Sequence, residues 1–136
     1  MDLYAEQILD HYRHPRGQTP LLSPTVSHTE KNTSCGDELT ILLDVKDDRI
    51  AGVSWTGTGC AVSQAGMSLL SEELIGKSVD VCRALSAEDL KTLLGVPIGP
   101  RRVKCALLCL HALKNALRIS QGKDVQSWTE TLGDTA

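Results

Sequence analysis

Three cysteines that lie far apart in this sequence, Cys35, Cys60 and Cys105, restrict how the chain can fold. Each stands at an expected bend or at the start of an expected helix, and Asp37 closely follows the first of them. Ligands so widely spaced cannot form a local zinc knuckle, because that kind of site takes its cysteines from neighbouring positions. Any site that they share is therefore assembled only by the tertiary fold.

The residues around these cysteines favour metal binding. Gly36 allows a sharp reversal that can aim the Cys35 thiol and the Asp37 carboxylate at one point. Cys60 and Cys105 each begin a helical pattern, where free backbone N–H groups and the helix dipole favour the thiolate. The pattern indicates three thiolates and one carboxylate around zinc or ferrous iron, with Asp37 as the ligand that exchanges most easily.

The same residue types also have purely structural explanations. A free cysteine usually packs as a small buried hydrophobe, and an aspartate after a glycine often forms a turn. Packing is the preferred explanation for Cys82, to which no function is assigned, and for Cys109, which could also act as a reserve ligand. Three histidines are not expected among the ligands, because His11 and His14 resemble surface residues and His111 falls on the polar face of the last helix.

Size and composition suit one small domain. A chain of 136 residues can bury a continuous core without disulfides, so one domain over residues 1–136 is expected. The core must be largely aliphatic, because the sequence has no Phe and only two Trp and two Tyr. A formal charge of −3 argues against nucleic acid as the main partner.

The cellular setting is also predicted from the sequence. Its start lacks the pattern of a secretory signal, and no apolar run reaches membrane-spanning length, so a cytoplasmic protein without membrane association is expected. Five cysteines, an odd number, favour reduced thiols over a paired disulfide framework. The commonest nucleotide-binding, hydrolase and metalloprotease motifs are missing from the sequence.

Hydrophobic periodicity divides the chain into strands and helices. A hairpin is predicted from two alternating runs, residues 39–45 and 50–55, which are joined by Asp47 and Asp48. Residues 25–31 suit an edge strand beside this hairpin. The helical patterns, each with capping or glycine signals, cover residues 2–13, the stretch between Gly59 and Gly76, residues 86–95 and residues 102–120.

Four short motifs occur in order along nearly the whole chain. They are ILDHYRHPR at residues 8–16, NTSCGD at 32–37, GTGCA at 57–61 and RVKCA at 102–106. In this order they resemble the U-type iron–sulfur cluster assembly proteins, a family that includes IscU-like scaffolds, NifU N-terminal domains and SufU-like proteins.

The resemblance implies an α/β (α+β) fold in which a small antiparallel three-stranded sheet is packed on one face by helices. It also implies that Cys35, Asp37, Cys60 and Cys105 hold a zinc ion or a transient [2Fe–2S] cluster, with Asp37 making the bound group labile. Cys35 and Cys105 are the implied persulfide acceptors, which receive sulfur from a cysteine desulfurase.

The chain shares features with two branches of this family. Lys104, and not a histidine, precedes the third cysteine, and residues 98–102 read IGPRR where IscU-like scaffolds carry a chaperone-binding LPPVK segment. These departures resemble SufU-like proteins and give no support for a dedicated chaperone partner. The segment between Cys60 and Cys105 lacks the insertion typical of SufU-like proteins and so resembles a scaffold.

The expected function is that of a scaffold and not of an enzyme: it accepts sulfur from a desulfurase, assembles or relays a [2Fe–2S]-type cluster and delivers it to apo-proteins. The alternative is a zinc-dependent sulfurtransferase that relays persulfide sulfur without holding a cluster. A structural zinc domain ranks last, because such a site has no need of an exchangeable oxygen ligand. Lys104 is expected to steady a persulfide beside Cys105 or to pair with Asp37 when no metal is bound.

Overall fold

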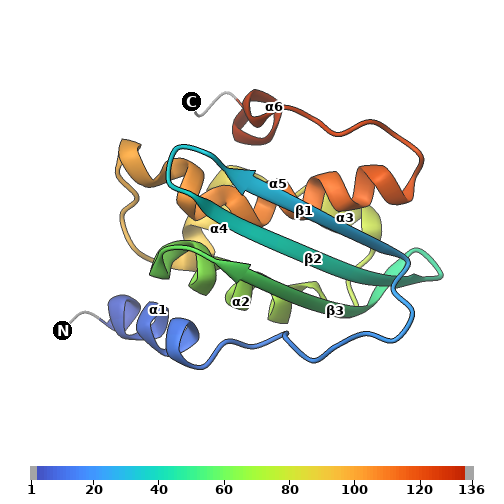
Figure 1. Cartoon of the computed structure of the whole chain (residues 1–136), viewed down its shortest axis with the longest axis horizontal. Coiled ribbons are helices and arrows are strands. Elements are labelled where there is room, and N and C mark those ends of the chain that lie inside the picture. The colour runs from blue at the N-terminus through green and yellow to red at the C-terminus, as the bar shows by residue number, and fades with distance from the viewer. Residues whose placement is uncertain (1–2, 134–136) are drawn as a thin grey trace.

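The computed structural model describes residues 3–133 and contains one antiparallel sheet of three strands in the order β1-β2-β3. Figure 1 shows that α2 and α5 lie against one face of this sheet, with α1 beside α2. The three-stranded α+β fold implied by the sequence resemblance is confirmed. The elements are α1 (Leu3–Arg13), β1 (Val26–Asn32), β2 (Asp37–Lys46), β3 (Arg49–Thr58), α2 (Ala61–Leu74), α3 (Val79–Arg83), α4 (Ala87–Leu94), the 3-10 turn η1 (Pro100–Arg102), α5 (Val103–Ser120) and α6 (Trp128–Leu132).

The predicted hairpin is present as β2 and β3. Lys46 pairs with Arg49 across a two-residue loop, and both loop residues, Asp47 and Asp48, have positive φ values of 52° and 59°. Two residues with positive φ form the kind of turn that matches the natural twist of paired strands. The predicted edge strand is confirmed as β1, which runs antiparallel to β2.

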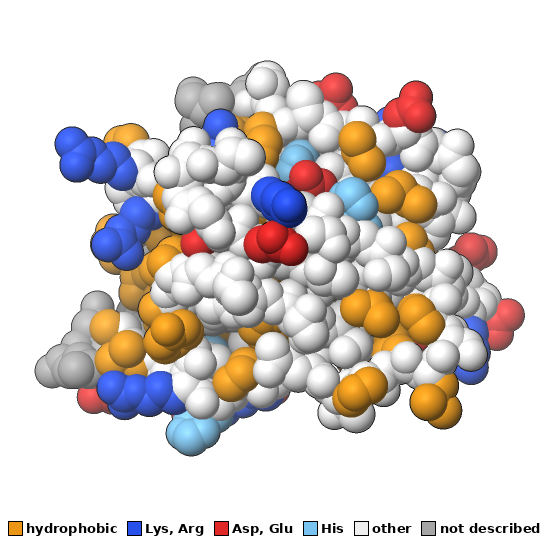
Figure 2. Space-filling model, in the orientation of Figure 1, with side chains coloured by type: hydrophobic (Ala, Val, Ile, Leu, Met, Phe, Trp, Pro, Cys, Tyr) orange, Lys and Arg blue, Asp and Glu red, His pale blue; other side chains and the backbone are white. Residues whose placement is uncertain are grey.

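The core lies between the sheet and the helices α2 and α5. In β2, Leu39, Ile41 and Leu43 are fully buried and alternate with partly exposed residues, so the sheet has one apolar face. Figure 2 shows the other face of the molecule, where the surface over the sheet is largely polar side chains and backbone. The sheet is thus covered by helices on one side only.

The predicted helices correspond to α1, α2, α4 and α5. Ser86 and Asp89 form the predicted capping box of α4, which ends at Gly95 in the left-handed region. A cap expected at Asp2 falls outside the described residues. The short helices α3 and α6 were not predicted, because five residues are too few to show a helical period.

Within residues 3–133, no helix combines the length and hydropathy needed to cross a membrane.

Buried polar contacts dock the N-terminal segment on the rest of the fold. His11 is buried, so the prediction of a surface position is wrong, whereas His14 is exposed as expected. The His11 Nδ1 atom lies 2.7 Å from the Ser68 hydroxyl in α2, which also accepts the Arg16 N–H at 2.8 Å. Trp55 Nε1 donates to the Arg16 carbonyl at 2.7 Å. The first sequence motif therefore holds α1 against α2.

Candidate metal centre

Cys35 reaches the site on the tight loop between β1 and β2. Asn32 pairs with Asp37 across the two strands, and the Asn32 carbonyl accepts the N–H groups of Cys35 and Gly36 at 3.2 and 2.8 Å. Gly36 has a φ of 77°, a conformation that glycine adopts without steric cost. The chain therefore reverses at Gly36 and leaves the Cys35 thiol exposed.

Cys105 lies in the first turn of α5 and meets this loop. Its Sγ atom is 3.0 Å from Cys35 Sγ, and Asn32 Nδ2 donates a hydrogen bond to it at 3.6 Å. Cys35, Asp37 and Cys105 offer ligand atoms that all lie within 4.8 Å of one another. We call these three residues the cysteine site. The fold thus brings together three of the four ligands expected from the sequence.

Asp37 has one bonded and one unbonded carboxylate oxygen. Its Oδ1 accepts the backbone N–H of Cys60 at 3.0 Å, whereas its buried Oδ2 has no hydrogen-bond partner among residues 3–133. A buried charged oxygen without a partner is costly, and a cation removes that cost. Two sulfurs and one oxygen are a donor set that suits zinc or ferrous iron, so the residues present fit a metal.

Cys60 is joined to the site through its backbone. It caps the N-terminus of α2, and its thiol is not one of the ligand atoms that lie within 4.8 Å of one another. Gly59 has a φ of 146°, and a Cβ atom at this position would overlap the Asp37 carboxylate. The glycine therefore lets the start of α2 approach Asp37 closely. Cys60 stays a predicted ligand.

The electrostatics of Cys105 differ from the sequence expectation. Burial raises the pKa of its thiol, and the neighbouring Cys35, Asp37 and Cys60 groups raise it further. The prediction that the helix start favours a thiolate at Cys105 is therefore wrong for the polypeptide alone, because lost solvation and nearby like charges outweigh the helix dipole. A bound cation would favour the thiolate again.

The remaining two cysteines pack in the core. Cys82 and Cys109 are both fully buried, in agreement with the packing explanation. Burial raises the pKa of the Cys109 thiol to about 12 and also raises the pKa of Cys82. Both thiols are therefore poor nucleophiles.

The polar face predicted for the last helix is largely covered. His111 of α5 is buried, so the exposure expected from its place on this face is wrong, and Asn115, one turn further along, is buried as well. His111 Nδ1 lies 2.6 Å from the Thr131 hydroxyl, and Asn115 Nδ2 donates to Glu30 at 2.8 Å. The C-terminal segment and β1 therefore cover a face whose polar pattern resembled a solvent-facing one. His111 lies away from the cysteine site, as expected.

A cavity of about 600 Å³ opens beside Cys35, lined also by Asn32, Arg101, Lys104 and Leu132 among others. Figure 2 shows Lys and Arg side chains projecting at the edge of the molecule where the chain before α5 lies. Among the residues that the structure describes, Lys104 and Asp37 form no ion pair, although one was considered above. The Lys104 ammonium instead lies 5.8 Å from the centroid of the Trp128 ring. The apolar residues of the C-terminal segment were the only sequence signal for this contact.

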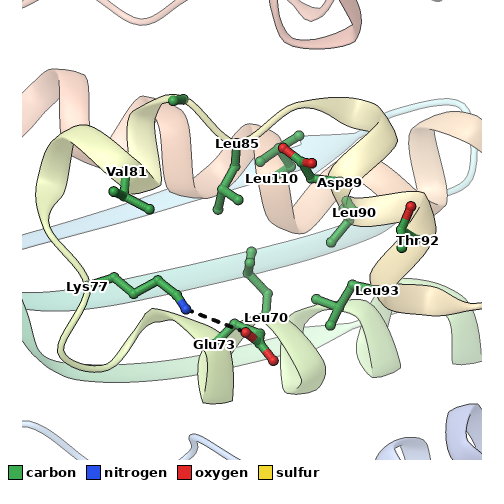
Figure 3. A pocket seen from close by; sticks show the side chains of 11 residues that line it. Leu70, Glu73, Lys77, Val81, Leu85, Asp89, Leu90, Thr92, Leu93 and Leu110 are labelled. Atoms are coloured by element: carbon green, nitrogen blue, oxygen red, sulfur yellow. Dashed lines mark ion pairs between the residues drawn. The ribbon is translucent and has the colours of Figure 1, made fainter.

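A second cavity, of about 480 Å³, lies among α2, α3 and α4 (Figure 3). Leucines such as Leu70, Leu85 and Leu93 supply much of its wall, and Lys77 pairs with Glu73 at 3.7 Å on one side. Its lining contains none of the predicted ligands, so it is separate from the cysteine site.

A three-stranded antiparallel sheet covered on one face by helices, with thiols and a carboxylate converging beside one loop, defines a class of small metal-binding assembly domains. The family described as the NifU-like N terminal domain matches residues 3–127. The chain belongs to this family of iron–sulfur cluster scaffold proteins, which confirms the resemblance seen in the four motifs.

Named relatives fall on both branches of the family. The iron–sulfur cluster assembly scaffold protein IscU of Thermotoga maritima is 34% identical over 132 residues, which cover 85% of this chain and 93% of that protein. The zinc-dependent sulfurtransferase SufU of Bacillus subtilis is 26% identical over 137 residues, which cover 88% of this chain and 92% of that one.

Solved structures share the fold. The SufU crystal structure from Fervidobacterium islandicum superimposes with a TM-score of 0.73 at 30% identity, over 82% of this chain and 94% of that chain. The N-terminal NifU-like protein of Brucella abortus gives a TM-score of 0.74 at 22% identity, over 89% and 96% of the two chains. The second likeness supports the fold alone.

Proposed function

We propose that this chain, working as one domain, accepts sulfur from a cysteine desulfurase and assembles or relays a [2Fe–2S]-type cluster for apo-proteins in the cytoplasm. The cluster is cargo that the protein builds and gives away. Cys35, Asp37, Cys60 and Cys105 are the proposed ligands, and Cys35 and Cys105 are the proposed persulfide acceptors.

The observation that carries this proposal is the meeting of an exposed thiol, a buried thiol and a partly unbonded carboxylate within 4.8 Å. Sulfur and oxygen donors in this arrangement suit iron and zinc, and the oxygen is the donor that exchanges most readily. A group held in this way can be both bound and released, which is what a carrier needs.

Exposure favours Cys35 as the first sulfur acceptor, because Cys105 is only 4% exposed. In the proposed step, the Cys35 thiolate attacks the outer sulfur of the desulfurase persulfide and forms a new S–S bond. The bond between the two desulfurase sulfurs breaks, and the desulfurase thiolate leaves and takes up a proton. No external oxidant or reductant is consumed in this transfer.

Anaerobic reconstitution tests the proposal. The protein is mixed with ferrous iron, L-cysteine, a cysteine desulfurase and dithiothreitol, which supplies the two electrons that convert each transferred sulfur to sulfide. We expect visible cluster absorption that is lost in Cys35→Ser, Cys60→Ser and Cys105→Ser. Cys82→Ala is the matched control, because Cys82 is a buried thiol that is not a proposed ligand, and we expect it to keep the signal. A wild-type protein without absorption, or Cys60→Ser with full absorption, contradicts the proposal.

A zinc-dependent sulfurtransferase that never holds a cluster is the second candidate. Lys104, in place of a histidine before Cys105, and the likeness to a protein named as such a sulfurtransferase support it. An element count on protein purified without oxygen separates the two. Stoichiometric zinc, together with faster desulfurase turnover and no cluster absorption, favours this second candidate; bound iron with sulfide favours the first.

A further inference from the structure

The side chain of Lys104 is held by the C-terminal segment and not by the cysteine site. Its Nζ atom lies 5.8 Å from the centroid of the Trp128 ring, within the range of a cation–π contact. Within residues 3–133, no carboxylate forms an ion pair with Lys104. The Lys104 side chain is otherwise exposed, so the contact with Trp128 restricts the positions that its ammonium group can occupy.

Trp128 is itself fixed by buried groups of α5. Its ring stacks on the His111 ring, with centroids 4.1 Å apart and planes at 23°. The segment around it is anchored as well, because the Gln126 N–H donates to Asn115 Oδ1 at 2.7 Å and Thr131 bonds to His111. The position of the Trp128 ring therefore follows from a buried polar network and not from a loose tail.

The cavity beside Cys35 joins this network to the cysteine site. Lys104 and Leu132 line the same cavity as the exposed Cys35 thiol. Its lining includes the cations Lys91, Arg101 and Lys104 and no carboxylate, although Lys91 is paired with a glutamate outside the lining. Such a cavity attracts anions to the thiol.

We propose that Trp128 is a positioning residue, which holds the Lys104 side chain at this cavity so that it binds the carboxylate of a small persulfide donor arriving at Cys35. The inference rests on the proposed function and adds a part for the C-terminal segment. A lysine side chain loses much rotational freedom when it binds an anion. The Trp128 contact restricts the side chain beforehand, so the donor binds more tightly at the same rate of sulfur transfer.

The transfer step is the exchange described above, with a small donor in place of the desulfurase. The Cys35 thiolate bonds to the outer sulfur of R–S–S–H, the S–S bond of the donor breaks, and R–S⁻ leaves and takes the proton. The sulfur keeps its oxidation state. Lys104 makes no covalent bond and acts only on the carboxylate of the donor.

Two matched donors test the inference on the full chain. One is the persulfide of N-acetylcysteine, which carries a carboxylate, and the other is the persulfide of its methyl amide, which lacks one. Transfer to Cys35 is followed by alkylation and peptide mass spectrometry. The variants are Trp128→Leu, which removes the aromatic ring, Trp128→Phe, which keeps one, and Lys104→Met.

We expect Trp128→Leu and Lys104→Met to raise the half-saturating concentration of the carboxylate donor about two- to fivefold, the range of an exposed cation–π contact, with the maximal rate of transfer to Cys35 little changed. Trp128→Phe should restore most of the wild-type value, and the variant that combines Trp128→Leu with Lys104→Met should be no worse than Lys104→Met alone. The half-saturating concentration of the amide donor should stay the same in all variants.

Three results overturn the inference. They are an unchanged half-saturating concentration of the carboxylate donor in Trp128→Leu, an equal rise for both donors, and a Trp128→Leu effect that persists in full when Lys104 is already Met. A wild-type protein in which neither donor modifies Cys35 contradicts the proposed function itself. The two failures are therefore distinguishable. Lys104→Met changes an exposed side chain, so it tests the charge even if Trp128→Leu folds poorly.

Discussion

The sulfur atoms of Cys35 and Cys105 lie 3.0 Å apart, although one belongs to the β1–β2 loop and the other to α5. A disulfide needs a separation of about 2.05 Å, so a small movement of the exposed loop residue would allow the bond. The same two thiols are proposed to bind the metal or cluster. Oxidation and metal binding are therefore expected to compete for them.

We predict that diamide, which removes two electrons and two protons from a pair of thiols, forms a Cys35–Cys105 disulfide in protein stripped of metal. Stoichiometric zinc should slow the reaction at least about tenfold, because coordinated thiolates are not free to attack. Non-reducing peptide mapping identifies the bond. Cys82 and Cys109 serve as internal controls, because both are buried. A disulfide that forms equally fast with zinc present contradicts the shared-ligand arrangement.

Gly59 is predicted to be necessary for the geometry of Asp37. In Gly59→Ala, the new Cβ would meet the Asp37 carboxylate, and the φ of 146° is unfavourable for alanine. We expect a loss of about 1–3 kcal/mol in the free energy of unfolding and at least about tenfold weaker zinc binding. Urea titration and chelator competition measure the two effects.

Gly99→Ala is the matched control for this variant, because a Cβ at Gly99 meets nothing within 4 Å. It should keep wild-type zinc affinity and stability. If Gly59→Ala behaves in the same way, the close approach of Gly59 to Asp37 has no functional consequence.

Acid is predicted to weaken the folded state through His111. Burial lowers the pKa of this histidine from its ordinary value of 6.5, as does His28, whereas Glu30 opposes the shift. The unfolded chain therefore binds the proton more readily, and the free energy of unfolding falls as the pH drops from about 6.5 towards the lower folded pKa. One such proton changes stability by at most about 1.4 kcal/mol per pH unit.

Urea unfolding at pH 7.5, 6.5 and 5.5 checks this sign. His111→Gln should be less stable overall and should lose less stability between the two acidic points than the wild type. His14→Gln, which replaces an exposed histidine by the same residue, is the control for the substitution itself. A steeper acid loss in His111→Gln would show that another group is responsible.

Ser68 is predicted to be a main anchor of α1. Its hydroxyl is fully buried, bonds to His11 Nδ1 and accepts the Arg16 N–H. Ser68→Ala leaves both partners without their bond, at a cost of about 1–3 kcal/mol for a buried polar group left unsatisfied. Thermal unfolding measures the loss, and Ser23→Ala, at an exposed serine, should be neutral. An unchanged melting temperature in Ser68→Ala would mean that other contacts hold α1.

Much of the fold follows from local patterns in the sequence. The alternation over residues 39–45, the turn at Asp47 and Asp48 and the capping box at Ser86 each depend on nearby residues, and each is present in the structure. The four motifs likewise identified the iron–sulfur cluster scaffold family, and they contain the four proposed ligands. The short helices α3 and α6 escaped prediction because they contain too few residues to show a period.

What only the tertiary structure decided is which polar residues lose contact with water. His11, His111 and Asn115 resemble surface residues in the sequence, yet distant segments cover all three. The same packing buries Cys105 and raises its pKa, against the expectation from its helix position. Backbone conformation responds mainly to neighbouring residues, whereas solvation depends on segments from anywhere in the chain. For that reason the sequence could propose the thiols of the site, but only the folded protein determined the 3.0 Å spacing of Cys35 and Cys105, the burial of Cys105 and the contact of Lys104 with Trp128.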